Sequence, residues 1–492
     1  MITRDFCDIY SNILLFKTQN HKSRTTKMLD SIHIKALKNI VGADNCYDDK
    51  AHLLAYCYDA TRERYEPEAV VFPRDEGEVS AILKYANVHK IPVIPRGAGS
   101  GFTGGALPAK GGIILALEKH FNKILEIDEK NLIARVQPAV INKHFQNEVE
   151  KLGLFYPPDP ASQEYSTLGG NVSENAGGMR AAKYGITKDF VMALRAVLPN
   201  GEIIRAGKKT IKDVAGYNVA GILIASEGTL AVITEITLKL IPKPKFKKSA
   251  LGVFPSIESA MNAVYKSMAS GVTPVAMEFL DNLSIRAVEE KFHKGLPTEA
   301  GAILITQVDG DLEVQIQNQI ALLESRFREN GCIEFKIAQN AQEEEDLWFA
   351  RRNASQSINI YGKKKLNEDI TVPRSRLPEL LARIDEMSKK YGFKIPCFGH
   401  TGDGNVHTNV MVGDPSKPLS EEELARGHKC IEEIFKIAVE LEGTLSGEHG
   451  IGLSKAPFMH LAFSKAEMEL FSAIKKAFDP NNILNPHKMG LA

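Results

Sequence analysis

The stretch PRGAGSGFTGG, residues 95–105, places five glycines in eleven positions directly after the apolar run of residues 91–94. Within it, Gly99, Gly101 and Gly104 match the Gly-x-Gly-x-x-Gly pattern of a Rossmann loop. A Rossmann loop leads at once into a helix whose free N–H groups hold a pyrophosphate. Here Pro108 and two more glycines follow, before an apolar strand. We therefore predict a loop without a helix, in which successive backbone N–H groups bind an anion.

A second glycine-rich segment spans residues 156–185, where prolines stiffen the entry and Gly/Asn pairs permit left-handed backbone. For the first segment, residues 95–105, the alternative is a tight turn between strands, which one or two glycines would satisfy. Two such segments in one half of the chain favour a long ligand held at two points. FAD, with a pyrophosphate in its middle, is such a ligand.

The bulk composition describes an ordinary soluble protein, with 43% hydrophobic and 25% charged residues. The 492 residues predict roughly two or three domains. Lys+Arg and Asp+Glu are equal at 61 each, which argues against a nucleic-acid partner. The six cysteines are scattered without a Cys-x-x-Cys pair, which argues against an iron–sulfur cluster, a structural zinc site or a disulfide framework.

The chain has no run of about 20 uncharged apolar residues, as a membrane span would need. We expect a cytoplasmic protein, with peripheral attachment to the inner face of the membrane left open. Residues 1–27 lack the apolar core of a signal peptide. The internal Met28 suggests that these residues are a disordered or wrongly assigned extension.

Hydrophobic patterning predicts an α+β fold. A strand near 69–73, a helix over 75–90 and a strand near 91–97 give a β-α-β start, and two further strands follow. Prolines and lysines at 241–249 mark a domain boundary. The second half alternates helices with strands, and the tail after residue 471 is a helix followed by a turn.

Four residues near the carboxyl terminus form a candidate metal and acid–base site. His400 and His407 lie in GHTGDGNVHTN, and Glu448 and His449 lie in SGEHGIG. Two imidazoles and a carboxylate suit zinc, manganese or iron with open coordination positions. A histidine of near-neutral pKa suits a general base. Structural or exposed histidines are the alternative.

These motifs together resemble the FAD domain of the vanillyl-alcohol-oxidase superfamily, and within it the FAD-dependent D-2-hydroxyacid dehydrogenases, from about residue 66 to the carboxyl terminus. The resemblance implies a PCMH-type FAD-binding domain of two subdomains, followed by an α+β substrate or cap domain. It predicts the following division: 1–65, N-terminal extension and helical segment; 66–245, FAD-binding domain; 246–470, substrate domain with the metal site; 471–492, tail returning to the flavin.

The resemblance also implies which residues bind FAD. They are Pro95, Arg96, Gly97, Ala98, Gly99, Ser100, Gly101, Gly104, Gly105, Pro158, Asp159, Leu168, Gly169, Gly170, Asn171, Asn175, Gly177, Gly178, Tyr184, Gly185, Glu227, Gly228, Val232, Ile233 and Asn485. Ser100 stands where members with covalent flavin often carry histidine, so we expect non-covalent FAD. His487 replaces the usual glycine of the terminal turn, which leaves a flavin contact by Lys488 open.

By the same resemblance, His400, His407 and Glu448 hold a divalent metal and His449 is the general base. A role for His449 as a fourth ligand or a supporting residue is the alternative. A substrate carboxylate needs a guanidinium or amide donors. Position in the family favours Arg351 over its neighbour Arg352, and Asn409 is a second donor; a solvated arginine pair is the alternative.

The expected reaction is oxidation of a small D-2-hydroxyacid, glycolate or D-lactate, to the 2-oxoacid. Hydride passes to flavin N5, and electrons continue to an acceptor other than NAD: a quinone, a cytochrome, a partner flavin or an iron–sulfur partner subunit. We expect a homodimer or a hetero-complex. The rivals are a D-2-hydroxyglutarate dehydrogenase, an alkyl-glycerone-phosphate-synthase-like FAD transferase and a non-catalytic FAD-binding subunit.

Overall fold

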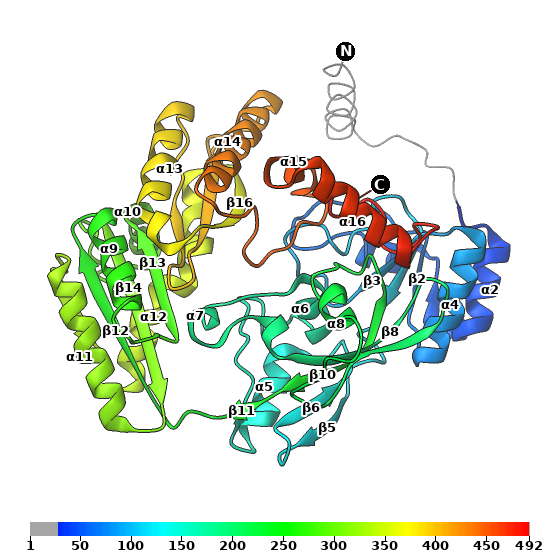
Figure 1. Cartoon of the computed structure of the whole chain (residues 1–492). Helices are drawn as coiled ribbons and strands as arrows, with labels where there is room; N and C mark the ends of the chain where they lie inside the picture. Colours follow the sequence, from blue (N-terminus) through cyan, green and yellow to red (C-terminus); the bar gives the residue numbers. More distant parts are fainter. Residues whose placement is uncertain (1–27, 492) are drawn as a thin grey trace.

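The computed structural model describes residues 28–491, so the predicted N-terminal extension, residues 1–27, lies outside the described part. The described chain contains sheets of four, five and seven strands and a short two-stranded ribbon. Figure 1 shows the first two sheets on the right and the seven-stranded sheet on the left. The chain passes from one part to the other at residues 241–246, inside the predicted boundary segment.

The four-stranded sheet has the order β1-β2-β4-β3, with parallel pairing among the last three strands. Its helix α4 is capped by Asp75, whose side chain accepts a hydrogen bond from the N–H of Glu78, and acidic residues lie in the first turn. This part comprises α2 (Ser31–Val41), β1 (Cys46–Tyr47), α3 (Lys50–Ala55), β2 (Ala69–Val71), α4 (Glu76–His89), β3 (Val93–Arg96) and β4 (Ile113–Ala116).

The five-stranded sheet is antiparallel and has the order β5-β6-β10-β8-β9. Its elements and those beside it are β5 (Ile124–Asp128), β6 (Ile133–Val136), α5 (Asn142–Glu150), β7 (Leu154–Phe155), α6 (Leu168–Glu174), α7 (Ala181–Tyr184), β8 (Val191–Val197), β9 (Ile203–Gly207), α8 (Val219–Leu223), β10 (Val232–Lys239) and β11 (Ile241–Pro242).

The second glycine-rich segment differs from the expected loop, because helix α6 forms inside it. Thr167 caps α6 by accepting the N–H of Gly170, and Asn175 ends it with a left-handed φ of 54°. The glycines therefore serve a short helix as well as the loops around it. Within the Gly/Asn pairs, left-handed backbone occurs at Asn175 alone, since the paired glycines have no positive φ.

The seven-stranded sheet is antiparallel throughout, in the order β15-β12-β14-β13-β17-β18-β16. Its strands are β12 (Phe246–Phe254), β13 (Ala276–Asp281), β14 (Ala302–Gly310), β15 (Glu334–Ile337), β16 (Lys364–Thr371), β17 (Cys397–His400) and β18 (Asn405–Val412). The core on one face includes α9 (Ile257–Met268), α11 (Glu313–Glu329), α13 (Leu377–Tyr391) and α14 (Glu421–Glu440). The core on the other face includes α10 (Asn282–Phe292) and α12 (Ala341–Ser357).

The carboxyl-terminal segment returns to the first sheet. After α15 (Met459–Ala462) and α16 (Lys465–Phe478), Leu484 forms a parallel bridge with Val93 of β3, and the N–H of Asn485 donates to the carbonyl of Val93 at 2.9 Å. Figure 1 shows α16 in red beside the blue elements of the first sheet. The tail thereby reaches the strand that leads into the first glycine-rich loop.

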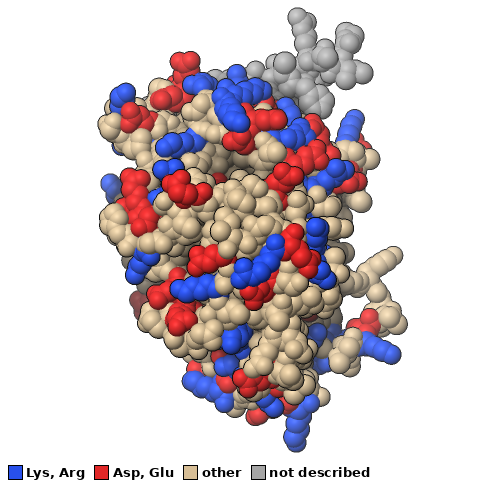
Figure 2. Space-filling view, turned by 90° about the vertical axis from the view of Figure 1, so that its left-hand side faces the viewer, with Lys and Arg blue, Asp and Glu red and all other residues tan. Residues whose placement is uncertain are grey.

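The surface agrees with the balanced composition. On the face shown in Figure 2, basic and acidic side chains are interspersed. Among residues 28–491, no helix is long and apolar enough to cross a bilayer.

Candidate active site

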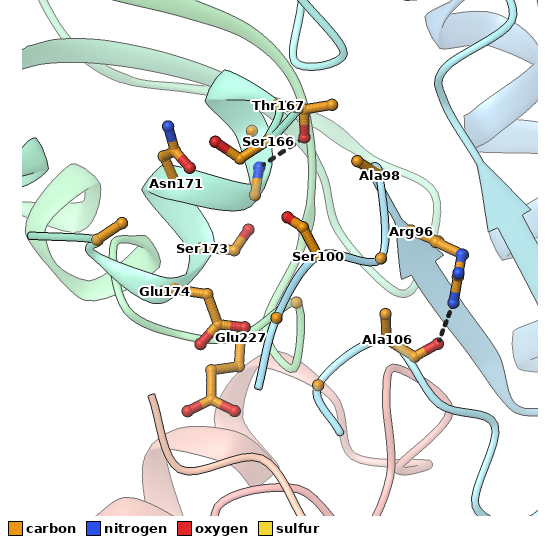
Figure 3. A pocket seen from close by; sticks show the side chains of 18 of the residues that line it. Arg96, Ala98, Ser100, Ala106, Ser166, Thr167, Asn171, Ser173, Glu174 and Glu227 are labelled. Carbon is orange, nitrogen blue, oxygen red and sulfur yellow. Dashed lines mark hydrogen bonds between the residues drawn. The ribbon is translucent and has the colours of Figure 1, made fainter. Parts of the chain in front are cut away.

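A cavity of about 1200 Å³, including its open mouth, lies where the two glycine-rich segments meet (Figure 3). Backbone from both segments and from the start of β10 forms its walls. No helix starts after the first glycine-rich loop, as predicted. The predicted FAD-binding residues that line this cavity are Pro95, Arg96, Gly97, Ala98, Gly99, Ser100, Gly101, Gly105, Gly169, Gly170, Asn171, Gly177, Glu227, Gly228, Val232 and Ile233.

Other predicted FAD-binding residues lie outside this lining and support it. The carbonyl of Pro158 accepts hydrogen bonds from the amides of Asn142 and Gln146. Asn485 donates from Nδ2 to the carbonyl oxygens of Gly105 and Glu227, at 2.8 and 2.7 Å. The residues outside the lining are Gly104, Pro158, Asp159, Leu168, Asn175, Gly178, Tyr184, Gly185 and Asn485.

Arg96 lines the cavity, but its guanidinium points away from it. Figure 3 shows the side chain directed toward Ala106, away from Ser100 and Asn171. It donates to the carbonyl oxygens of Tyr58 at 2.8 Å and Ala106 at 3.4 Å. The guanidinium therefore connects the start of the loop to Ala106, just after its end, and to Tyr58. Its charge is directed away from a ligand in the cavity.

The cavity wall carries polar groups that lack a protein partner. The backbone amides of residues 98–103 donate to no group in the described chain, which makes this loop a free array of N–H donors. Ser166 Oγ and Asn171 Nδ2 are buried in the wall and also have no partner among residues 28–491. Buried polar groups are costly unless they are hydrogen-bonded. The wall therefore fits an elongated anionic ligand, and FAD satisfies that requirement.

The predicted metal ligands converge on one point although they come from three segments. His400 ends β17, His407 lies in β18, and Glu448 lies in the turn 446–450. The Nε2 atoms of the two histidines are 3.4 Å apart, and Glu448 Oε1 lies 3.6 Å from His400 Nε2 and 3.4 Å from His407 Nε2. Metal–ligand distances of about 2.1 Å separate tetrahedral ligands by about 3.4 Å. The donor set and its spacing fit a zinc-sized divalent cation.

Glu278 of β13 positions His400, and the sequence analysis did not identify it. The two residues are cross-strand partners, and Glu278 Oε1 lies 2.7 Å from His400 Nδ1. This contact leaves Nε2 directed to the other ligands, the arrangement common around metal-bound histidines. Burial by itself would lower the pKa of His400, but the carboxylates of Glu278 and Glu448 outweigh it and hold that pKa well above its usual value.

Unlike His400, whose raised pKa favours the protonated ring, the other two predicted ligands are shifted toward the forms that bind a metal. Burial holds the pKa of His407 well below its usual range, so its ring is neutral. Burial would raise the pKa of Glu448, but the neighbouring histidines, His400 first, outweigh it and lower that pKa to about 2. A neutral imidazole and an ionised carboxylate are the species that bind divalent cations.

Asp369 of β16 organises the turn that carries Glu448 and His449. Its Oδ2 accepts the backbone N–H groups of Gly447, Glu448 and His449 at 2.9, 2.6 and 3.0 Å. Its Oδ1 lies 3.1 Å from His449 Nδ1 and also accepts from the buried ammonium of Lys455. Burial would raise the pKa of Asp369, but His449 and Lys455 hold it well below its usual range. One buried carboxylate thus sets both the turn and the His449 ring.

His449 lies between the cavity and the three predicted metal ligands, His400, His407 and Glu448. Both Glu448 and His449 line the cavity, so the cavity and the triad share this turn. The His449 ring stacks on His407 with centroids 5.5 Å apart, and the ring of Phe102, 47% exposed, lies 5.3 Å away on the cavity side. Thr103 Oγ1 donates to the carbonyl of His449 at 3.2 Å. The first glycine-rich loop therefore contacts the turn directly.

The two arginines of α12 have different surroundings. Arg351 donates a hydrogen bond from Nε to Glu278 Oε2 at 2.6 Å. Its two terminal nitrogens donate to no other group among the described residues. Arg352 pairs with Glu345 on the surface. Arg351 is therefore anchored beside the triad with its outer face available, whereas Arg352 matches the solvated alternative.

Asn409 lies two residues beyond His407 on the same strand and is buried. Its Nδ2 donates to the carbonyl oxygens of Pro396 and His407, at 3.2 and 3.1 Å. Its Oδ1 has no partner among residues 28–491. The group that this residue leaves free is an acceptor, whereas the sequence analysis expected a donor.

Several cavity residues were missed because they are common residue types, mostly serine, alanine, proline and apolar residues, that carry no distinctive spacing. They are Phe102, Ala106, Leu117, Pro138, Pro160, Ala161, Ser162, Ser166, Thr167, Ser173, Glu174, Ala176 and Ala231. For the supporting carboxylate Glu278, the available signal was a charged residue inside an otherwise apolar strand. Asp369 lies in the polar strand KKLNEDIT, where one more acidic residue carries no signal.

Comparison with known proteins agrees with this geometry. Residues 67–207 match the family described as FAD binding domain, and residues 243–489 match the family described as FAD linked oxidases, C-terminal domain. Glycolate oxidase subunit GlcD of Bacillus subtilis (strain 168) is 42% identical over 454 residues, 92% of this chain and 95% of that protein. D-lactate dehydrogenase of Anaerostipes hadrus is 34% identical over 471 residues, 94% of this chain and 97% of that protein.

Among solved structures, p-cresol methylhydroxylase with bound substrate has a TM-score of 0.76 at 18% identity, over 93% of this chain and 96% of that chain. At this identity the likeness concerns the fold alone. The predicted α+β fold with a PCMH-type FAD-binding domain is confirmed.

Proposed function

We propose that this chain, which belongs to the family of FAD-linked oxidases, oxidises a small D-2-hydroxyacid, glycolate or D-lactate, to the 2-oxoacid. The observation that carries the proposal is the turn that the cavity and the candidate metal site share. Glu448 belongs to the group His400, His407 and Glu448, and both Glu448 and its neighbour His449 line the cavity. Relatives named for glycolate and for D-lactate support this substrate class.

The cavity residues would hold FAD without a covalent bond, and FAD when bound supplies the hydride acceptor. His400, His407 and Glu448 would hold zinc, manganese or iron, and such an ion when bound supplies a Lewis acid for the hydroxyl and carboxylate of a 2-hydroxyacid. The polar cavity wall and the ligand spacing described above support both assignments.

His449 is the proposed general base. Asp369 Oδ1, 3.1 Å from Nδ1, fixes the proton on that nitrogen, which leaves Nε2 to accept the hydroxyl proton of the substrate. Nε2 lies 3.8 Å from Glu448 Oε1, on the side of the triad. This orientation supports a general base that acts on a substrate held beside the three predicted ligands.

Arg351 is the proposed partner of the substrate carboxylate. Its Nε is held by Glu278, so the planar guanidinium is oriented before a substrate binds, and its outer nitrogens are free to form a bidentate pair. Because Glu278 also holds His400, one carboxylate would align the substrate anchor with the metal ligand.

The electrons would pass from the flavin to a quinone, a cytochrome or an iron–sulfur partner subunit. Relatives named as subunits of glycolate oxidase support a hetero-complex. D-2-hydroxyglutarate is the second substrate candidate, favoured by a D-2-hydroxyglutarate dehydrogenase of Stutzerimonas stutzeri that is 30% identical over 94% of this chain and 99% of that protein.

The first test is anaerobic. The purified, FAD-loaded protein is mixed in turn with glycolate, D-lactate, L-lactate and D-2-hydroxyglutarate, and the visible absorption band of the oxidised flavin is followed. We expect rapid bleaching by glycolate or D-lactate and none by L-lactate. Chelator treatment and His449→Ala should each abolish bleaching while the protein keeps its flavin. A flavoprotein that none of these acids bleaches would refute the hydroxyacid oxidation and favour a transferase.

A further inference from the structure

Glu174, the last residue of α6, has no role in the reaction described so far. Its carboxyl group faces the cavity, and its Oε2 atom is buried without a hydrogen-bond partner among residues 28–491. A buried carboxyl oxygen without a partner is costly, and native proteins rarely keep one unless a ligand completes it. The position therefore points to a ligand contact.

Glu174 lies at the end of the cavity next to the catalytic turn. A Cβ added to Gly105 would come within 2.8 Å of Glu174 Oε1, and one added to Gly450 would overlap Oε2. Gly450 directly follows His449. The Glu174 carboxyl thus fills a gap that two glycines leave open, between the first glycine-rich loop and the turn of His449.

The neighbouring carboxyl, Glu227, is already committed to the protein. Its two oxygens accept the backbone N–H groups of Ile451 and Gly452, each at 2.7 Å. Figure 3 shows Glu174 and Glu227 with their carboxyl groups close together. Of the two, Glu174 is the carboxyl left to meet a ligand.

The charges around Glu174 favour its neutral form. Burial, then Glu227 and Asp59, raise its pKa well above the usual value, and Lys488 opposes them. Lys488 Nζ itself donates to the carbonyl of Leu107 at 2.7 Å. A neutral carboxyl group that faces a buried cavity is a hydrogen-bond donor.

We propose that Glu174 contacts the flavin ring at the end of the cavity beside His449, where its protonated carboxyl donates a hydrogen bond that favours the reduced flavin. The inference rests on the proposed function, which puts the redox-active ring beside the general base. Reduction adds electron density to the ring, so a donor aimed at it stabilises the reduced form more than the oxidised form.

The test measures the flavin itself and needs no hydroxyacid. FAD-loaded wild type, Glu174→Gln and Glu174→Ala are reduced anaerobically by a chemical reductant in the presence of a reference dye, and FAD affinity is measured by titration of the FAD-free protein. Glu164→Ala, an exposed glutamate of the same segment, is the matched control. Thermal unfolding of each FAD-free variant checks the fold.

At the potential where wild type is half reduced, we expect the ratio of reduced to oxidised flavin in Glu174→Ala to be about tenfold lower, the effect of losing one hydrogen bond. For a two-electron couple this corresponds to a midpoint lower by about 30 mV. Glu174→Gln, which keeps a neutral donor, should remain near wild type, as should Glu164→Ala. Loss of FAD from Glu174→Ala, with its FAD-free form as stable as wild type, also supports the contact.

Two results would overturn the proposal. Glu174→Ala with the potential and FAD affinity of wild type would show that the carboxyl does not reach the flavin. A higher potential for Glu174→Gln would show that Glu174 is ionised in the flavoprotein. Because the reductant replaces the hydroxyacid, both results can be told apart from a failure of the proposed function, which would appear only in the substrate assay.

Discussion

Glu278 and His400 face each other across β13 and β17, with Glu278 Oε1 2.7 Å from His400 Nδ1. The other oxygen of the same carboxylate lies 2.6 Å from Nε of Arg351, whose side chain is only 12% exposed. Glu278 itself is fully buried. A single carboxylate therefore fixes a proposed metal ligand and a proposed substrate anchor at once.

Glu278→Gln should weaken metal binding by about 10- to 100-fold, the usual effect of losing a group that supports a metal-bound histidine. The amide can accept from one partner only, so either His400 or Arg351 loses its orientation. Metal affinity is measured by titrating the metal-free protein with zinc and a competing chromophoric chelator. Glu334→Gln, an exposed glutamate on the edge strand β15, serves as the control. Equal zinc affinity in Glu278→Gln and wild type would contradict a positioning role for Glu278.

Asp369→Asn should destabilise the protein by about 3–5 kcal/mol, because it removes the closer anionic partner of the buried Lys455 ammonium and leaves only Glu368, whose Oε2 lies 3.6 Å away. The free energy of unfolding is measured in urea. The double variant Asp369→Asn/Lys455→Met removes the buried cation and should recover part of that stability. It should not recover substrate-dependent bleaching, since the His449 ring still lacks its carboxylate. Recovery of both would show that Asp369 serves stability alone.

Gly101→Ala tests whether a ligand lies against the first glycine-rich loop. The nearest protein atom to the added methyl group would be Glu174 Oε1 at 4.0 Å, so the FAD-free protein has room for it. We expect unchanged unfolding of the FAD-free form and an FAD dissociation constant higher by roughly tenfold to a hundredfold, from an overpacking cost of about 1–3 kcal/mol. If FAD binds the variant as tightly as wild type, its pyrophosphate does not approach this part of the backbone.

The buried Lys488 of the carboxyl-terminal tail should make the free energy of unfolding depend on pH in the alkaline range. Burial lowers the pKa of Lys488 from 10.5 to about 8 in the folded protein. Between these two values the unfolded chain binds more protons than the folded one, so the free energy of unfolding should rise as pH increases from about 8 to 10.5. Lys488→Met should lack this contribution. Urea unfolding of both proteins across that range gives the difference; parallel curves would refute a buried, charge-destabilised Lys488.

Local features of the fold could be predicted because they depend on near neighbours in the sequence. The helix α4 has its cap at Asp75 and acidic residues in its first turn, and an apolar run leads into the glycine-rich loop of residues 95–105. Pro108 and the two glycines after that loop excluded a Rossmann helix, and the structure has no helix there. Helix α6 was missed, because two glycines near its start have low helix propensity and packing overrides that propensity.

The partners of the site residues could not be predicted. His400, His407, Glu448 and His449 stand out in the sequence as glycine-flanked histidines and a Glu-His pair. Glu278, by contrast, is 122 residues from His400 and looks like any acidic residue in a strand.

Sequence alone thus identified the candidate metal-binding side chains and the glycine-rich loops, since these are properties of single residues and short spacings. The tertiary structure decided which carboxylates serve them. Cross-strand register brings Glu278 to His400 and Asp369 opposite His407. Chain return brings the turn of Glu448 and His449 against the first glycine-rich loop. Register depends on how whole strands bury their apolar faces, and no local pattern encodes it.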